Sequence, residues 1–234
     1  MNAAMETVII VAGGSGSRMQ TELPKQFIEI DGKAVLIHTI EAFLAYNSSI
    51  NIIIVLPKGF EELWGMKIKK SFPQQEIMVC VGGATRTESV KNGLSLCSNK
   101  GIVAIHDAAR PFASAKLIGE CFTIAQQKGS CIPCISCNDS ARVITNTIEK
   151  QSTINVDLES SFFDRSKLLM VQTPQCFDAM KLKELYANSN KNFSDDAALW
   201  ESAGEKIFVC EGETKNFKIT TPIDLLVAKA ILTS

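Results

Sequence analysis

The chain has 234 residues, of which 46% are hydrophobic and 21% are charged, so it can form a full hydrophobic core and is not wholly disordered. Its 24 basic and 25 acidic side chains give a net charge of −1, which argues against binding to nucleic acid or an anionic membrane through excess Lys and Arg. Any anionic ligand must therefore be held by a few placed cations.

The start of the chain and its cysteines indicate a cytoplasmic protein. No apolar stretch approaches the roughly 20 residues that a membrane span requires. Residues 1–7 carry no basic segment ahead of the first apolar run, so we expect no signal peptide. Eight cysteines are too dilute for a disulfide scaffold, and we expect them to be reduced thiols.

Strand and helix patterns alternate along the chain. Short continuous apolar runs predict buried strands at residues 8–12, 52–56, 77–81, 101–105 and 131–136. Helical spacing of apolar residues predicts helices at 36–44, 88–96, 117–126, 181–187 and 195–203. Ser194 is the expected N-cap of the fifth helix and Gly204 its stop. A strand at 206–210 and a last helix opened by Thr221 and Pro222 complete the pattern.

Residues 138–165 interrupt this alternation with a polar stretch that holds only β-branched patches. A compact domain seldom carries so long a loop without a role, and we interpret the stretch as a protruding β-arm. The rest predicts one α/β domain with a mainly parallel sheet. Ligands of such sheets bind beyond the carboxyl ends of the strands, so functional residues should follow Ala12, Val81 and Ile105.

The strongest motif is the segment AGGSGSRM at residues 12–19, followed by LPKQF at 23–27. Closely spaced glycines let several backbone N–H groups point at one anion, and Arg18 and Lys25 add positive charge beside them. The P-loop pattern fails because no Lys-Ser or Lys-Thr follows, and the dinucleotide fingerprint fails because it lacks its third glycine. We therefore interpret the segment as a phosphate-binding loop of another kind.

Four further segments could contribute to the same site. GGATRTESV at 82–90 is a second glycine turn that leads into a helix, and it can equally be a plain turn. HDAARP at 106–111 places Asp107 at a strand end, where a carboxylate can bind Mg²⁺ or orient an attacking oxygen. His106 fits a structural role better than that of a general base, and Arg110 fits an ion-pair partner of Asp107. Arg165 and Lys218 are cations suited to a second phosphate.

The cysteines at 131, 134 and 137 have the spacing C-x-x-C-x-x-C, which can hold zinc or an iron–sulfur cluster. On a strand, however, Cys131 and Cys137 face opposite to Cys134. We therefore favour a buried strand in which cysteine acts as a small apolar residue.

Taken together, the six motifs resemble the 2-C-methyl-D-erythritol 4-phosphate cytidylyltransferases of the non-mevalonate isoprenoid pathway. The resemblance covers nearly the whole chain and rests on these segments in order: AGGSGSRM…PKQF (12–27), GGATRTESV (82–90), HDAARPF (106–112), DRSKLLMVQTPQ (164–175), SDDA (194–197) and NFKITTP (216–222). It implies a single Rossmann-like nucleotidyltransferase domain over residues 1–234. It also implies a homodimer whose β-arm reaches its neighbour.

The resemblance further implies that CMP is transferred from CTP to the methylerythritol phosphate, with Mg²⁺ bridging the triphosphate. Arg18 and Lys25 would stabilise the transition state, while Arg165, Lys218, Ser140 and Asp107 would position the substrate. Asp107 would also lie near the metal. The nucleotide site would be lined by Ala12, Gly13, Gly14, Gly83, Ser89 and Ala108.

Two positions depart from the family pattern. Ala84 stands where some members carry an acidic residue that touches the nucleotide, and Ser140 stands where a Thr often helps to hold the substrate. Ribitol-5-phosphate cytidylyltransferase is the alternative within this class. The alternatives from other classes are a nucleotide-binding module or NAD(P)-dependent oxidoreductase, and an iron–sulfur protein.

Overall fold

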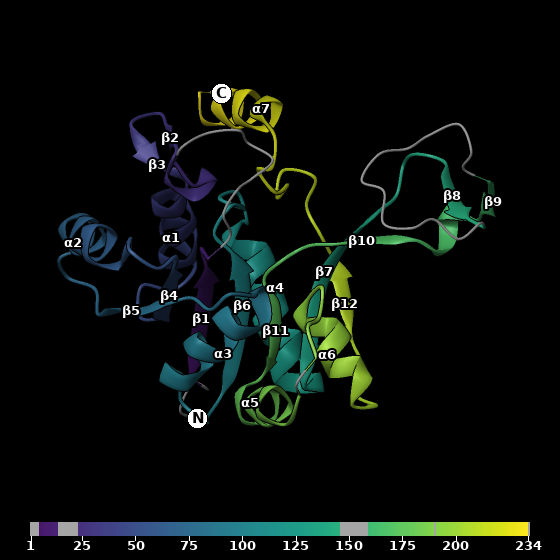
Figure 1. The fold of residues 1–234 in the computed structure, drawn as a ribbon, viewed down its shortest axis with the longest axis horizontal. Coiled ribbons are helices and arrows are strands. Elements are labelled where there is room, and N and C mark those ends of the chain that lie inside the picture. Colours follow the sequence, from purple (N-terminus) through teal and green to yellow (C-terminus); the bar gives the residue numbers. More distant parts are fainter. Residues whose placement is uncertain (1–4, 14–22, 146–158, 190, 234) are drawn as a thin grey trace.

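A computed structural model describes all residues except 1–4, 14–22, 146–158, 190 and 234. Its centre is an eight-stranded sheet in the order β10-β7-β11-β6-β1-β4-β5, with β12 also paired to β7 (Figure 1). Four neighbouring strands are mutually parallel: β1 (Glu6–Val11), β4 (Asn51–Leu56), β5 (Ile77–Val81) and β6 (Ile102–Asp107). Their carboxyl ends therefore lie at one edge of the sheet.

The other half of the sheet mixes strand directions. β11 (Gln175–Asp178) runs antiparallel to both β6 and β7 (Ser130–Ser136), and β10 (Leu169–Val171) runs antiparallel to β7. β12 (Val209–Glu211) pairs with β7 in parallel. The prediction of a mainly parallel sheet is thus confirmed, with antiparallel additions on one side. The strand expected at 206–210 is wrong in its first half, because pairing begins only at Val209.

Helices cover both faces of the sheet. Side chains of β1 alternate between them: Val8 and Ile10 belong to one core cluster and Ile9 to the other. The first cluster is covered by α1 (Val35–Tyr46), α2 (Glu61–Ser71) and α4 (Ala115–Lys128). The second is covered by α3 (Arg86–Leu96), α5 (Ala179–Asn188) and α6 (Asp196–Ser202). Among the residues described, no helix is long and apolar enough to span a membrane.

The expected helices form, and the helix-end chemistry explains their bounds. α7 (Pro222–Leu232) opens with Thr221 as its N-cap and with a capping box completed by Asp224, as predicted. The predicted N-cap of α6 is wrong by one residue: the side chain of Asp195, not Ser194, accepts the N–H of Ala198. The sequence reading missed α2, because only Trp64 and Ile68 are buried among its 11 residues.

The described part of the stretch from 138 to 165 contains a two-stranded ribbon of the kind expected for the arm. β8 (Ala141–Ile144) and β9 (Ser160–Phe163) pair as an antiparallel ribbon that is separate from the main sheet. In Figure 1 this ribbon projects away from the helices, on the side of the sheet where β10 lies. Residues 146–158 lie outside the described part of the chain. A second small sheet pairs β2 (Glu29–Ile30) with β3 (Lys33–Ala34) near α7.

Candidate active site

The two glycine turns meet at the buried side chain of Ser89. A β-carbon added to Gly13 or to Gly82 would lie 3.0 Å from the Ser89 hydroxyl oxygen. That hydroxyl accepts the N–H of Gly83 at 3.1 Å and donates to the carbonyl of Thr85 at 2.9 Å. Any larger residue at Gly13 or Gly82 would therefore press on Ser89 where the ends of β1 and β5 close on α3. Gly14 and Arg18, which were also expected in this loop, lie outside the described residues.

The second turn is tied to the first turn of α3. Thr85 caps the helix by accepting the N–H of Glu88, and the Glu88 carboxylate accepts the N–H of Ala84 at 2.6 Å. A β-carbon on Gly83 would lie 2.2 Å from the β-carbon of Glu88, so no larger residue fits without rearrangement. Gly83 and Ser89 therefore lie together at this edge of the sheet, as the sequence predicted.

Asp107 ends β6 and is the electrostatic centre of this edge. Its carboxylate lies 2.9 Å from the Lys218 ammonium and 3.6 Å from Nε of Arg110. Burial alone would raise the pKa of Asp107, but the charges of Lys218, Arg86 and Arg110 outweigh that effect and hold the pKa well below its usual range. Asp107 is consequently ionised at any physiological pH, and the predicted ion pair with Arg110 is confirmed.

Lys25 reaches the same place from the other end of the chain. It begins the short 3₁₀ helix η2 (Lys25–Phe27), and its ammonium donates to the carbonyl of Ile219 at 2.8 Å. Ile219 follows Lys218 directly. The hydrogen bond, which spans 194 residues of sequence, therefore brings Lys25 close to the segment that carries Lys218. Arg110 supports the same segment by donating to the carbonyl of Asn216 at 2.7 Å.

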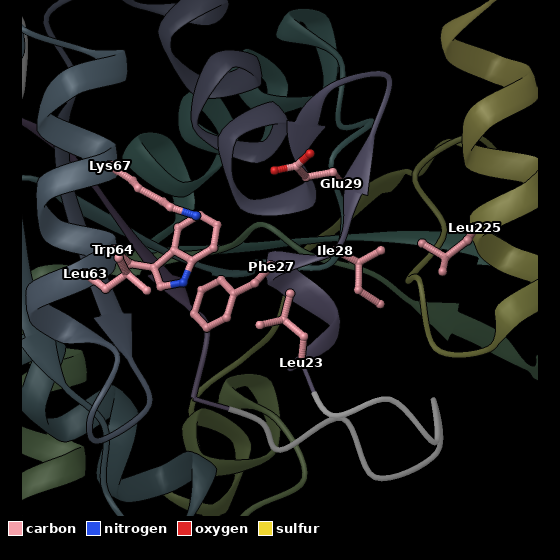
Figure 2. A pocket seen from close by; sticks show the side chains of 8 residues that line it. All are labelled: Leu23, Phe27, Ile28, Glu29, Leu63, Trp64, Lys67 and Leu225. Atoms are coloured by element: carbon pink, nitrogen blue, oxygen red, sulfur yellow. The ribbon is translucent and has the colours of Figure 1, made fainter.

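An apolar anchor holds η2 in position. Phe27 is buried and its ring stacks on that of Trp64, with the centroids 4.2 Å apart. Figure 2 shows both rings in the wall of a cavity of about 620 Å³, with Leu23 and Leu225 also lining it. The Gln26 side chain donates to the carbonyl of Ala12. The residues that follow Lys25 are therefore fixed to the core and to the end of β1, which limits where Lys25 can reach.

His106 is a structural residue, as expected. Its side chain is fully buried, and its ring nitrogens contact the carbonyl of Arg110 at 3.0 Å and the hydroxyl of Thr173 at 3.1 Å. The carbonyl of Arg110 can only accept, so the proton of the neutral ring is on Nε2, and the Thr173 hydroxyl, which also accepts the N–H of Asp107, donates to Nδ1. Burial lowers the pKa of His106 to about 4, so the ring is neutral and braces the turn after β6.

Arg86 is a site residue that the sequence analysis did not single out. Its guanidinium lies 2.5 Å from the fully buried carboxylate of Asp196, which also accepts the hydroxyl of Tyr186. The charge of Arg86 helps to lower the pKa of Asp107, so this cation faces both carboxylates. The one available signal was the acidic SDDA segment at 194–197, because a buried Asp requires a cationic partner.

Arg165 and Ser140 are placed differently from the other expected residues. Both are exposed at the root of the arm, where Arg165 begins η3 (Arg165–Lys167) and donates to the carbonyl of Asn138. No hydrogen bond or ion pair among the described residues joins either side chain to Asp107 or Lys218. Within one chain, the structure therefore gathers Lys25, Asp107 and Lys218 but leaves the arm residues apart.

Ala12 and Ala108, two of the residues expected to line the nucleotide site, follow the ends of β1 and β6. The N–H of Ala12 donates to the carbonyl of Val55, and that of Ala108 donates to the carbonyl of Val11. Each residue directly follows a parallel strand, and both side chains are buried. They therefore continue the strand ends that flank the first glycine loop.

The motif at 131, 134 and 137 does not gather its sulfurs. Cys131 and Cys134 belong to the core clusters on opposite faces of the sheet, as the strand periodicity predicted. Cys137 follows the end of β7. A single metal held by this motif is therefore ruled out.

Comparisons with known proteins point to one family. The family model for 2-C-methyl-D-erythritol 4-phosphate cytidylyltransferase (IspD) matches residues 6–234. The chain is 39% identical to the enzyme of that name from Bacteroides thetaiotaomicron, over 97% of this chain and 99% of the relative. It is 40% identical to that of Bacteroides fragilis, over 97% and 99%.

Solved structures agree with these sequence relatives. The crystal structure of 4-diphosphocytidyl-2C-methyl-D-erythritol synthase from Anaerococcus prevotii is similar with a TM-score of 0.80 and 29% identity, over 98% of this chain and 96% of that one. The crystal structure of 2-C-methyl-D-erythritol 4-phosphate cytidylyltransferase from Thermus thermophilus gives a TM-score of 0.77 and 29% identity, over 98% and 100%.

The buried imidazole predicts a pH dependence of folding. The pKa of His106 is about 4 in the folded chain and near 6.5 when unfolded, so the unfolded chain takes up the proton first as the pH falls. Stability from the neutral ring is therefore full above pH 6.5 and lost as the pH falls to about 4, by roughly 3 kcal/mol in total. The free energy of unfolding, measured with urea at several pH values across this window, should fall less steeply with decreasing pH in His106→Gln than in the wild type. Glutamine keeps a hydrogen-bond donor but does not titrate. The same dependence of the free energy of unfolding on pH in both proteins would contradict this role.

Proposed function

Because the chain belongs to the 2-C-methyl-D-erythritol 4-phosphate cytidylyltransferase family, we propose that its chemistry occurs where the two glycine turns, Asp107 and Lys218 meet. The enzyme transfers CMP from CTP to 2-C-methyl-D-erythritol 4-phosphate in isoprenoid precursor biosynthesis. The products are 4-diphosphocytidyl-2-C-methyl-D-erythritol and pyrophosphate. The family assignment does not favour the ribitol phosphate alternative or an oxidoreductase.

The reaction brings two anions together, and this sets what the protein must supply. An oxygen of the polyol phosphate forms a bond to the α-phosphorus of CTP, and the bond from that phosphorus to the bridging oxygen breaks to release pyrophosphate. The attacking phosphate is already ionised, so no general base is needed, which agrees with a His106 that is fully buried and has both ring nitrogens hydrogen-bonded within the protein. Catalysis then depends on positioning and on preorganised positive charge.

We assign transition-state stabilisation to Lys25 and Arg18. The observation that carries the proposal is the hydrogen bond of Lys25 to the carbonyl of Ile219, because it places a cation of the glycine loop beside the Lys218 segment. A lysine held there lies between the proposed nucleotide site and the proposed polyol phosphate site, so its ammonium can contact both substrates. Arg18 lies outside the described residues, and its assignment rests on its place in the same loop.

The nucleotide is assigned to the ends of β1, β5 and β6. The backbone there is formed by small residues, and any side chain on Gly83 would collide with Glu88. Ser89 holds the second turn through its contacts to Gly83 and Thr85, and its hydroxyl lies against Gly13 of the first turn. The residues assigned to this site are Ala12, Gly13, Gly14, Gly83, Ser89 and Ala108.

The polyol phosphate is assigned to Lys218, with Asp107 orienting that lysine and the substrate hydroxyls. Arg165 and Ser140 complete this subsite from the arm of a second chain. Support comes from their exposure on a ribbon that projects from its own sheet and from the exposed Phe162 and Ile144 on that ribbon. We therefore propose a homodimer in which the arms are exchanged.

Mg²⁺ is the proposed cofactor, and Asp107 is the protein group that fits it. The ionised carboxylate is a suitable oxygen ligand, while Lys218 and Arg110 already occupy one side of it. No cluster of three acidic or histidine side chains lies beside it in the described chain, so the triphosphate oxygens would supply most of the ligands. The ion would neutralise charge on the triphosphate and the leaving pyrophosphate.

Two further proposals concern the whole chain. Residues 1–234 form a single nucleotidyltransferase domain, because the large sheet takes strands from both halves of the sequence and the family model spans 6–234. The enzyme works in the cytoplasm, because all eight cysteines lie in the described part of the chain and all are free thiols.

Replacing Lys25 tests the catalytic assignment. Lys25→Ala should lower kcat by about 10²–10³-fold at saturating CTP, because a preorganised cation is lost where charge develops. The measurement is pyrophosphate release with both substrates saturating. Lys100→Ala is the matched control, because it removes an exposed lysine beside the start of β6, at the opposite edge of the sheet. Near-normal kcat in Lys25→Ala would remove the lysine from the catalytic machinery.

Subunit mixing tests the shared site. If Arg165 acts in the partner's site, each mixed dimer of Lys25→Ala and Arg165→Ala chains has one doubly defective site and one intact site. Random exchange should then restore about a quarter of the sites, because half of the dimers are mixed.

The control mixture is Lys25→Ala with Arg18→Ala, which should recover nothing because both residues come from one loop. If Arg165 instead serves its own chain, the first mixture also stays inactive. Mass spectrometry of the mixture must first establish that the subunits have exchanged.

A further inference from the structure

Four buried cysteines lie close together on the face of the sheet that α4 covers. The sulfurs of Cys121 in α4, Cys131 in β7 and Cys210 in β12 all lie within 4.8 Å of one another, and those of Cys121 and Cys210 are 3.5 Å apart. Cys176 in β11 is paired in register with Cys131, so its side chain is on the same face. Two strands and a helix thus bring three thiols together, and a third strand places Cys176 on the same face beside Cys131.

The cluster is sealed from solvent. Cys121, Cys131 and Cys176 are fully buried, and Cys210 is 8% exposed. All four belong to one core cluster whose other members are apolar, including Phe122, Ala125 and Ile118. The cluster is on the opposite face from Cys134 and lies apart from the glycine turns, and the proposed cytidylyl transfer does not use it.

We propose that Cys121, Cys131 and Cys210, with Cys176 as the fourth ligand, form a site for a thiophilic metal ion of the zinc class. Zinc bonds to thiolates at about 2.3 Å, which places the sulfurs of a tetrahedral site about 3.8 Å apart. The separations among Cys121, Cys131 and Cys210 bracket that value, so small side-chain rotations would bring these three sulfurs to a common metal, and Cys176 would turn toward it from the same face. Four sulfur ligands without oxygen or nitrogen select zinc over magnesium or calcium.

Zinc binds the thiolate form of cysteine. Binding would therefore release the thiol protons and replace S–H contacts in the core with metal–sulfur bonds.

The site would tie together elements that are far apart in the sequence. Cys121 and Cys210 are separated by 89 residues, and β12 leads into the segment that carries Glu213, Asn216 and Lys218. Glu213 accepts hydrogen bonds from Ser114 at the start of α4. A metal at the cluster would therefore stabilise the junction of α4 with β12, and the expected effect is on folding and stability.

The test uses the full chain, because the buried ligands require loading during folding. Denatured, reduced protein is refolded with a slight excess of Zn²⁺ or Co²⁺, or with a chelator, and free metal is removed by gel filtration. We expect about one metal per chain by elemental analysis, thiolate-to-cobalt charge-transfer absorption, and an unfolding midpoint several degrees above that of the chelator-treated protein.

Variants separate the site from adventitious binding. Cys121→Ala and Cys210→Ala should each lower metal retention at least about ten-fold, because even a lost outer-shell partner typically weakens a metal site by that factor. Cys134→Ala is the matched control, because it removes a buried thiol from the other face of β7 and should retain full loading. Circular dichroism in chelator shows whether each variant folds, and Cys131→Ala replaces any variant that does not.

Three results would overturn the proposal. One is less than about a tenth of an equivalent of metal in folded wild-type protein. Another is equal retention by Cys134→Ala and Cys210→Ala. The third is a disulfide between Cys121 and Cys210, which would have to close their sulfurs from 3.5 Å to about 2.05 Å and would appear as a loss of two hydrogens by mass.

Discussion

The carboxylate of Asp107 holds together cations that would otherwise repel one another. Lys218 and Arg110 contact it directly, and the charge of Arg86 acts on it from α3. These three residues come from three separate parts of the chain. An enzyme that must bring two phosphates together needs such cations fixed before the substrates arrive, and a single, largely buried carboxylate at the end of β6 provides that order.

Much of the surrounding structure serves to hold that carboxylate in place. The neutral ring of His106 braces the turn after β6, and Thr173 links this ring to the N–H of Asp107. Asn216 is fully buried and donates to the carbonyl of Thr173, which ties the Lys218 segment to the same point. Two opposed core clusters keep β6 itself rigid between its helices.

Whether the sequence predicts a given part of this arrangement depends on how far apart along the chain the interacting residues are. Continuous apolar runs predicted β5 with its observed bounds, and the glycine spacing located the turns that meet at Ser89. Helix α2 was not predicted, because it is rich in lysine and buries few side chains, so its apolar pattern is weak. The bond from Lys25 to Ile219 and the cysteine cluster join residues far apart in sequence, and no local spacing encodes such contacts.

A double-mutant cycle between Asp107 and Lys218 tests most directly whether the carboxylate organises the cations. The measurement is kcat/KM for 2-C-methyl-D-erythritol 4-phosphate, at saturating CTP, in the wild type, Asp107→Asn, Lys218→Met and the double variant. If Asp107 acts by holding Lys218, the second substitution should cost little once the first is present, with a coupling energy of about 1 kcal/mol or more. Costs that add to within about 0.5 kcal/mol would show that the two residues act independently and would contradict this account.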